Sequence, residues 1–123
     1  MGYLDVIYGQ VIVGNKRGKG LGFPTANVHI ARDLEEGIYI SETEVDNQKY
    51  HSLTFIGVAE TFDEVVYLSE THILDFDQDI YYKMIKVSLI KKIRDNQKFT
   101  SVNDLITEMK KDEVVTREYF FNN

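Results

Sequence analysis

A loop rich in glycine and in cations is the first segment whose residue types suit chemistry. Glycine lets backbone N–H groups approach an anion without a Cβ in the way, and the cations add local positive charge. The loop is not a Walker A sequence, because Gly20 stands where Ser or Thr should follow the lysine. No helix pattern follows it, as a dinucleotide fingerprint requires. We predict a phosphate cradle, with a solvated hairpin loop as the alternative. The residues expected to contact the phosphate are Gly14, Lys16, Gly18, Lys19, Gly20 and Gly22.

Two neutral oxygen ligands follow Pro24, the only proline of the chain. Proline fixes its own φ and favours an extended conformation before it, so the chain leaves the loop in a defined direction. In an extended strand Thr25 and Asn27 point the same way. A hydroxyl and an amide oxygen suit a Mg²⁺ ion that already carries waters and phosphates. We predict a magnesium site, and the alternative is a pair of turn residues that bond their own backbone.

Glu70 is the candidate acid or base. By alternation it shares a face with Val66, Leu68 and Leu74, which we expect to be the buried face. A partly desolvated carboxylate has a raised pKa and can accept a proton from an alcohol, as a general base does. The alternative is a salt-bridged or rim-exposed glutamate. His72 lies on the same face and is read as a hydrogen-bonded structural histidine.

The bulk composition limits what these residues can do. A chain of 123 residues has room for one domain, and its formal charge of −6 repels phosphate polymers and acidic membranes. The absence of cysteine removes disulfides, thiolate nucleophiles and zinc knuckles. No apolar run approaches the length of a membrane span, and no export signal begins the chain. We therefore expect a cytoplasmic domain that binds neither nucleic acid nor membrane.

Most of the chain reads with the period-two alternation of strands that bury one face. Asp46-Asn47 supplies a turn signal between the third and fourth predicted strands. The last strand has the clearest pattern: Ile85, Val87, Leu89 and Ile93 fall on one face, and Lys86, Ser88 and Lys92 fall on the other. The predicted strands are Asp5–Val13, Thr25–Ile30, Gly37–Thr43, Tyr50–Val58, Val65–Leu74 and Met84–Ile93.

Only the C-terminal part changes to a helical period. Ser101 can cap a helix with Asp104 three residues on, and one apolar stripe follows. Six short strands and one terminal helix predict a mainly β fold, a closed antiparallel barrel, because closure removes the edges that a small open sheet exposes. The stripe consists of Val102, Leu105, Ile106 and Met109.

Together these segments resemble the riboflavin kinase family, either the free-standing enzyme or the C-terminal half of bacterial bifunctional FAD synthetases. The resemblance runs from about Gly9 to Arg117. Its most specific part is the long block from Gly18 to Asn27, followed in order by the block that begins at Glu70. The matching segments are Gly9-x-Val11-x-x-Gly14, Gly18-Lys19-Gly20-Leu21-Gly22-Phe23-Pro24-Thr25-Ala26-Asn27, Gly37-Ile38-Tyr39, Ile56-Gly57, Glu70-Thr71-His72-Ile73-Leu74-Asp75-Phe76, Asp79-Ile80-Tyr81, Ile93-Arg94, Phe99-x-Ser101 and Asp112.

The resemblance implies a six-stranded Greek-key barrel with a C-terminal helix, and an enzyme that moves the γ-phosphate of ATP to the 5′-hydroxyl of riboflavin, giving FMN. It implies that Thr25 and Asn27 hold Mg²⁺ and, with the glycine loop, the nucleotide. Glu70 aligns with the catalytic glutamate, and the segment of Arg94 and Phe99 aligns with a flap that closes on the flavin. We expect a monomer that can be paired with an FMN adenylyltransferase domain.

Three departures from the family pattern leave alternatives open. Ala59 and Glu60 replace an amide and a proline, Lys19 replaces an arginine, and Tyr82 replaces a turn glycine. A second hypothesis is therefore a weakened paralogue that binds flavin or nucleotide and acts as a sensor. A third is a barrel that binds nucleic acid through Lys16, Arg17 and Lys19, which the net charge opposes.

Overall fold

The computed structural model describes residues 2–12, 25–30, 34–60 and 65–123. Among these residues no helix has the length and apolar character needed to cross a membrane. Six strands precede one helix, and all strand pairs are antiparallel. The elements are β1 (Asp5–Gln10), β2 (Ala26–Ile30), β3 (Gly37–Val45), β4 (Gln48–Glu60), β5 (Val65–Ile73), β6 (Met84–Arg94) and α1 (Val102–Asn122).

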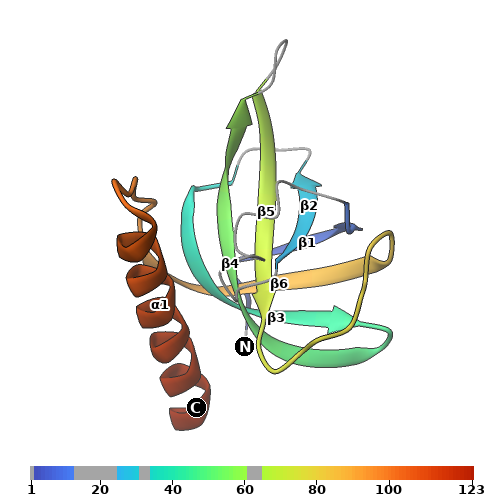
Figure 1. Ribbon diagram of the computed structural model, residues 1–123. Coiled ribbons are helices and arrows are strands. Elements are labelled where there is room, and N and C mark those ends of the chain that lie inside the picture. The colour runs from blue at the N-terminus through green and yellow to red at the C-terminus, as the bar shows by residue number, and fades with distance from the viewer. Residues whose placement is uncertain (1, 13–24, 31–33, 61–64) are drawn as a thin grey trace.

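The strands curl into a nearly closed barrel with α1 on its outside (Figure 1). The strand order is β1-β6-β3-β4-β5-β2, so β1 and β2 are the two edges. Between the edges the Ile12 N–H donates to the Asn27 carbonyl oxygen over 2.8 Å, in an isolated antiparallel bridge. The prediction of six antiparallel strands and a C-terminal helix is confirmed. Full closure and the Greek-key path remain predictions.

Apolar side chains from every strand fill the barrel, as the period-two pattern predicts. Strands β3, β4 and β5 also turn hydroxyl groups inward, and these groups hydrogen-bond to one another: Ser41 with Thr54 at 2.8 Å, and Thr54 with Thr71 at 2.9 Å. Mutual pairing removes the penalty of burying them. The buried apolar core consists of Ile7, Val11, Ala26, Val28, Tyr39, Val45, Ile56, Ile73, Ile80, Ile85, Val87 and Leu89.

Strand β6 follows the predicted alternation only as far as Leu89. Its register against β3 shifts twice, between Ile38 and Tyr39 and between Ile40 and Ser41. An inserted residue in one strand locally breaks the alternation of faces. Ile93, predicted to continue the buried face, is therefore only half-buried. The same shifts place Arg94 opposite Ile38, at the wall of a cavity described below.

Helix α1 begins at the predicted cap. The Asp104 N–H donates to Ser101 Oγ over 3.1 Å. The predicted apolar stripe is only partly right, because Val102 is exposed while Leu105, Ile106 and Met109 are half-buried. The fully buried side chains of the helix are instead polar, Asp112 and Thr116.

Three turns among the described residues contain non-glycine residues with left-handed backbone, at Asp46-Asn47, Asp75 and Tyr82. In the predicted Asp46-Asn47 turn both residues have positive φ, 50° and 67°, which Asp and Asn tolerate. Tyr82, for which the sequence predicts either avoidance of positive φ or strain, adopts φ 70°. Its N–H donates to the Val11 carbonyl oxygen over 2.7 Å, so a core contact holds the strained conformation.

Replacing Tyr82 should show this strain directly. Tyr82→Gly is expected to be more stable than Tyr82→Ala by about 1 kcal/mol, because only glycine adopts left-handed backbone without a Cβ clash. Both variants lose the same ring, so the difference isolates the backbone. Urea unfolding followed by circular dichroism measures it. Equal stability of the two variants would show that the turn is relaxed.

Candidate active site

Glu70 lies on β5, where it is paired with Asn27 of the neighbouring strand β2 and with Phe55 of the neighbouring strand β4. Side chains directly opposite in antiparallel strands have Cβ atoms about 4.5–5.5 Å apart. The pairing therefore brings the predicted base and one predicted magnesium ligand together from positions 43 residues apart in the sequence.

Glu70 is only 5% exposed, as predicted, but a different part of the molecule covers it. The barrel interior receives the alternate residues of β5, Ser69, Thr71 and Ile73. Glu70 and His72 instead face outward, into a cavity that α1 and the β6–α1 segment cover. Alternation within one strand could not show which face a terminal helix would bury.

Thr25 precedes β2 and lies at the junction of two cavities. Its Oγ1 atom is buried and has no hydrogen-bond partner among the described residues. A buried hydroxyl without a partner is costly, so this atom is available to hydrogen-bond or coordinate a ligand. Asn27 is buried as well, at 3% exposure.

The first cavity, of about 430 Å³, lies between the barrel and α1. It brings together Glu70 with Arg94 and Phe99, the two residues predicted to bind flavin. Aliphatic and aromatic side chains make up much of its wall. The lining residues are Thr25, Ile38, Leu53, Phe55, Glu70, His72, Arg94, Asn96, Gln97, Lys98, Phe99, Leu105, Met109 and Asp112.

The second cavity, of about 480 Å³, lies on the other side of Thr25. The turn between β5 and β6 forms much of its wall, and sequence reasoning assigned this turn no site residue. The lining residues are Val11, Thr25, Ala26, Thr71, Ile73, Phe76, Asp77, Gln78, Asp79, Ile80 and Tyr81. The predicted cradle residues Gly14, Lys16, Gly18, Lys19, Gly20 and Gly22 lie outside the described residues.

A largely buried ion pair connects α1 to the end of β6 at the wall of the first cavity. Arg94 donates from Nε to Asp112 Oδ1 over 2.8 Å and from Nη2 to Asp112 Oδ2 over 2.7 Å. The hydrogen bonds to Asp112 raise the pKa of the Arg94 guanidinium, although desolvation opposes the effect. The Asp112 side chain is 6% exposed, so this two-point contact is largely shielded from water.

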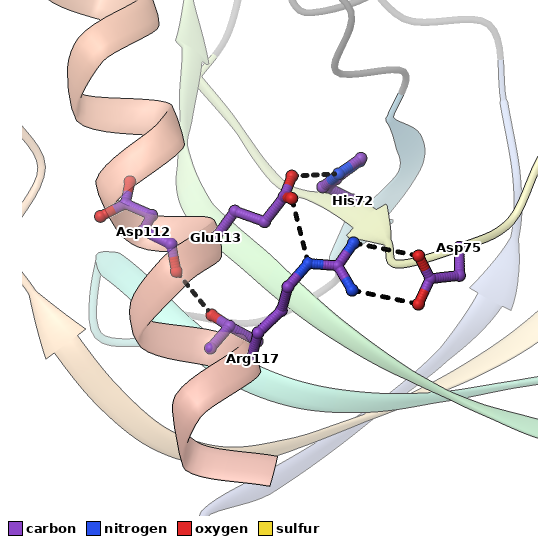
Figure 2. Close-up of polar contacts among 6 residues, drawn as sticks. His72, Asp75, Asp112, Glu113 and Arg117 are labelled. Carbon is purple, nitrogen blue, oxygen red and sulfur yellow. Dashed lines mark hydrogen bonds and ion pairs between the residues drawn. The ribbon is translucent and has the colours of Figure 1, made fainter. Parts of the chain in front are cut away.

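A second polar network connects α1 to the end of β5 (Figure 2). Arg117 donates to both carboxylate oxygens of Asp75, over 3.0 and 3.1 Å, and its Nε donates to Glu113 over 3.1 Å. Glu113 also lies 3.4 Å from Nε2 of His72, in the first cavity. The Arg117 bonds lower the pKa of Asp75. The structural reading of His72 agrees with this contact, whereas the Arg117 network was missed because its members are distant in sequence.

Comparison with known proteins gives the class of the chain. The family model described as Flavokinase, riboflavin kinase, matches residues 1–120. The chain therefore belongs to the riboflavin kinase family. This agrees with the resemblance that the sequence motifs carry.

Individual relatives are consistent with this membership. The bifunctional riboflavin kinase/FMN adenylyltransferase of Haemophilus influenzae is 37% identical over 119 residues, which cover 94% of this chain and 38% of the relative. A crystal structure described as a macrolide-efflux protein from Streptococcus pneumoniae aligns with a TM-score of 0.84 at 38% identity, over 91% of this chain and 38% of that one. The riboflavin kinase structure from Trypanosoma brucei has a TM-score of 0.64 at 24% identity, covers 93% of this chain and 78% of that one, and supports the fold.

The chain is much shorter than its curated relatives. It spans between 18% and 40% of the length of the most similar ones. Family membership therefore concerns this module, and the activities of the longer relatives belong to those proteins.

Proposed function

We propose that this module is a riboflavin kinase, which transfers the γ-phosphate of ATP to the 5′-hydroxyl of riboflavin and releases FMN and ADP. The observation that carries the proposal is the position of Thr25, which lines two cavities, one of which also contains Glu70. A phosphoryl transfer needs two substrates whose reacting ends meet. Two cavities that share Thr25 in their walls, one of them lined by the buried carboxylate of Glu70, suit this arrangement.

We assign the first cavity to the flavin and the second to the nucleotide. Leu53, Phe55, Leu105 and Met109 offer apolar surface to a flat aromatic ring, and the β6–α1 segment forms another part of the same wall. A bound flavin enclosed by these walls would limit the access of water, which competes with riboflavin as phosphoryl acceptor. The second cavity shares Thr25 with the first. In the sequence, Thr25 follows shortly after the predicted phosphate cradle.

Glu70 is proposed to orient the riboflavin 5′-hydroxyl and to accept its proton. Phosphoryl transfer passes through a loose transition state, so alignment and charge neutralisation matter more than covalent chemistry. The proton leaves the hydroxyl late, as the new O–P bond forms and the bond to ADP breaks. A carboxylate beside the hydroxyl directs the oxygen lone pair at phosphorus and receives that proton.

Thr25 and Asn27 are proposed to hold Mg²⁺ on the nucleotide. Thr25 Oγ1, which has no partner within the described part of the chain, and the buried Asn27 amide next to Glu70 are oxygen ligands that fit this ion. When bound, the ion neutralises the negative charge of the transferring phosphates. The hydroxyl and the amide fix the position of the phosphates relative to Glu70.

Loss of the proposed metal ligand Asn27 should weaken the apparent affinity for Mg²⁺ specifically. Asn27→Ala is expected to raise the Mg²⁺ concentration for half-maximal FMN formation by about 10- to 100-fold or more, since even outer residues of metal sites contribute that much. The measurement is initial rate against Mg²⁺ at saturating riboflavin and ATP. Asn103→Ala, an exposed amide at the start of α1, is the matched control and should change nothing. An unchanged Mg²⁺ dependence in Asn27→Ala would remove this residue from the site.

The function itself is tested by incubating the purified chain with riboflavin, ATP and Mg²⁺ and separating the flavins by chromatography. Formation of FMN supports the kinase. Flavin binding without turnover would instead support the sensor hypothesis, which the family comparison does not favour. Pairing with an FMN adenylyltransferase domain and a cytoplasmic location remain predictions; the names of bifunctional relatives support the first of these.

A further inference from the structure

Asn96 carries a buried acceptor for which the described residues provide no donor. It lies in the segment between β6 and α1 and lines the first cavity. Its Nδ2 donates to the Ile56 carbonyl oxygen over 3.1 Å and contacts Glu36 Oε1 at 3.4 Å. Its Oδ1 is buried and has no hydrogen-bond partner among the described residues.

The surrounding acceptors fix the orientation of this amide. Rotation of the side-chain amide by half a turn would place Oδ1 against the Ile56 carbonyl oxygen and the Glu36 carboxylate, and all three atoms only accept hydrogen bonds. Oδ1 therefore stays on the unpaired side. A buried acceptor without a donor is unfavourable, so the site is stabilised by a ligand that brings an N–H or O–H group.

The distance from Glu70 narrows down which ligand group this is. Phe55 faces Glu70 across the β4–β5 pair, and Ile56, which anchors Asn96, is the next residue of β4. Strands lie about 4.8 Å apart and successive residues about 3.3 Å apart, so the backbone of Ile56 lies about one strand spacing and one residue from that of Glu70. The Asn96 amide lies one hydrogen bond, 3.1 Å, beyond the Ile56 carbonyl oxygen. In a substrate whose terminal hydroxyl lies at Glu70, the secondary hydroxyls come before the ring and its imide N–H, so they are the first donors on the way from Glu70 toward Asn96.

We propose that Asn96 is a specificity-determining residue, whose Oδ1 accepts a hydrogen bond from a secondary hydroxyl of the ribityl chain. This inference rests on the proposed function, because it takes riboflavin as the occupant of the first cavity. It assigns Asn96 the selection of a polyhydroxylated chain over a plain alkyl chain of the same length. A buried acceptor left without its donor provides this selection.

A binding experiment with two flavin analogues tests the assignment. The first analogue keeps the ring and the terminal hydroxyl on a five-carbon chain without secondary hydroxyls, and the second is riboflavin methylated at the ring imide nitrogen. Dissociation constants are measured by quenching of flavin fluorescence, with Mg²⁺ and ADP present. The loss of affinity for the first analogue relative to riboflavin should be about 10-fold smaller in Asn96→Ala than in the unaltered chain. The relative loss for the second analogue should be equal in both proteins.

Each other outcome overturns the proposal. If both proteins discriminate equally between riboflavin and the first analogue, Asn96 does not contact the secondary hydroxyls of the ribityl chain. If they differ in their discrimination against the methylated ring, Asn96 contacts the imide instead. Asn103→Ala, which removes an exposed amide outside the wall of the first cavity, should keep the selectivity of the unaltered protein. If Asn96→Ala fails to fold, Asn96→Leu keeps the volume and gives the same comparison. Failure of riboflavin itself to bind would overturn the proposed function, a result distinct from binding without selectivity at Asn96.

Discussion

Glu70→Gln is expected to lower kcat for FMN formation by about 10²- to 10⁴-fold, the usual contribution of general acid–base catalysis. The amide keeps the size of the carboxylate but cannot accept the proton of the riboflavin hydroxyl. Glu70 is buried beside Asn27 and Phe55, so the replacement should leave the first cavity in place. The KM for riboflavin should change much less than kcat, because the lost interaction belongs to the transition state. Steady-state rates with varied riboflavin measure both quantities.

Glu113→Gln is the matched control for this experiment. Glu113 is a half-buried carboxylate near the same cavity that contacts His72 and Arg117 but is absent from the cavity wall. Its variant should retain kcat within a few-fold. If Glu70→Gln stays active while binding and folding are normal, the proton acceptor is another group and the mechanism must be reassigned.

The Asp112→Ala variant should show the largest loss of stability. Removal of one partner from a buried ion pair usually costs about 3–5 kcal/mol, and we expect about 2–3 kcal/mol here because Arg94 is partly exposed. The Arg94 side chain is 21% exposed while that of Asp112 is 6% exposed. The loss arises because a guanidinium that lines the first cavity is left without its two acceptors. Urea unfolding gives the change in the free energy of unfolding.

Two further variants separate the charge effect from packing. In Arg94→Met with Asp112→Leu both charges of the pair are gone, and Glu108, 4.0 Å from Arg94, keeps Lys111 as a partner, so much of the stability should return. Asp75→Ala, which removes the exposed partner of Arg117, should cost far less than Asp112→Ala. Equal losses for Asp75→Ala and Asp112→Ala would mean that shielding from water does not strengthen the Arg94 pair.

The order and type of the strands and the helix could be predicted from the sequence because local patterns determine them. The six alternating segments became β1 to β6 with shifts of only a few residues at their ends. The Ser101 cap and the Asp46-Asn47 turn depend on short-range geometry, which a sequence displays directly. The two register shifts of β6 were not predictable, because they depend on how Ile38 to Ser41 of β3 pair with that strand.

The candidate site residues could be named from the sequence, but their arrangement in space only in part. Residue type and order identified Thr25, Asn27 and Glu70, and strand pairing brings Asn27 and Glu70 together. Glu70 is buried as predicted, but what covers it was not foreseen, since the cover comes from α1 and the preceding segment, about thirty residues further along the chain. The unpartnered oxygen of Asn96 could not be foreseen, because it depends on where the Ile56 backbone and Glu36 lie in space.

The bridge between Ile12 and Asn27 also affects how the proposed metal site is prepared. The backbone of Asn27 is held on one side by Ile12 and on the other by β5. The backbone that carries its side-chain amide is therefore already ordered before a ligand binds. Binding need not restrict the backbone of this residue, so the affinity for a magnesium–nucleotide complex is not reduced by the entropy of ordering it.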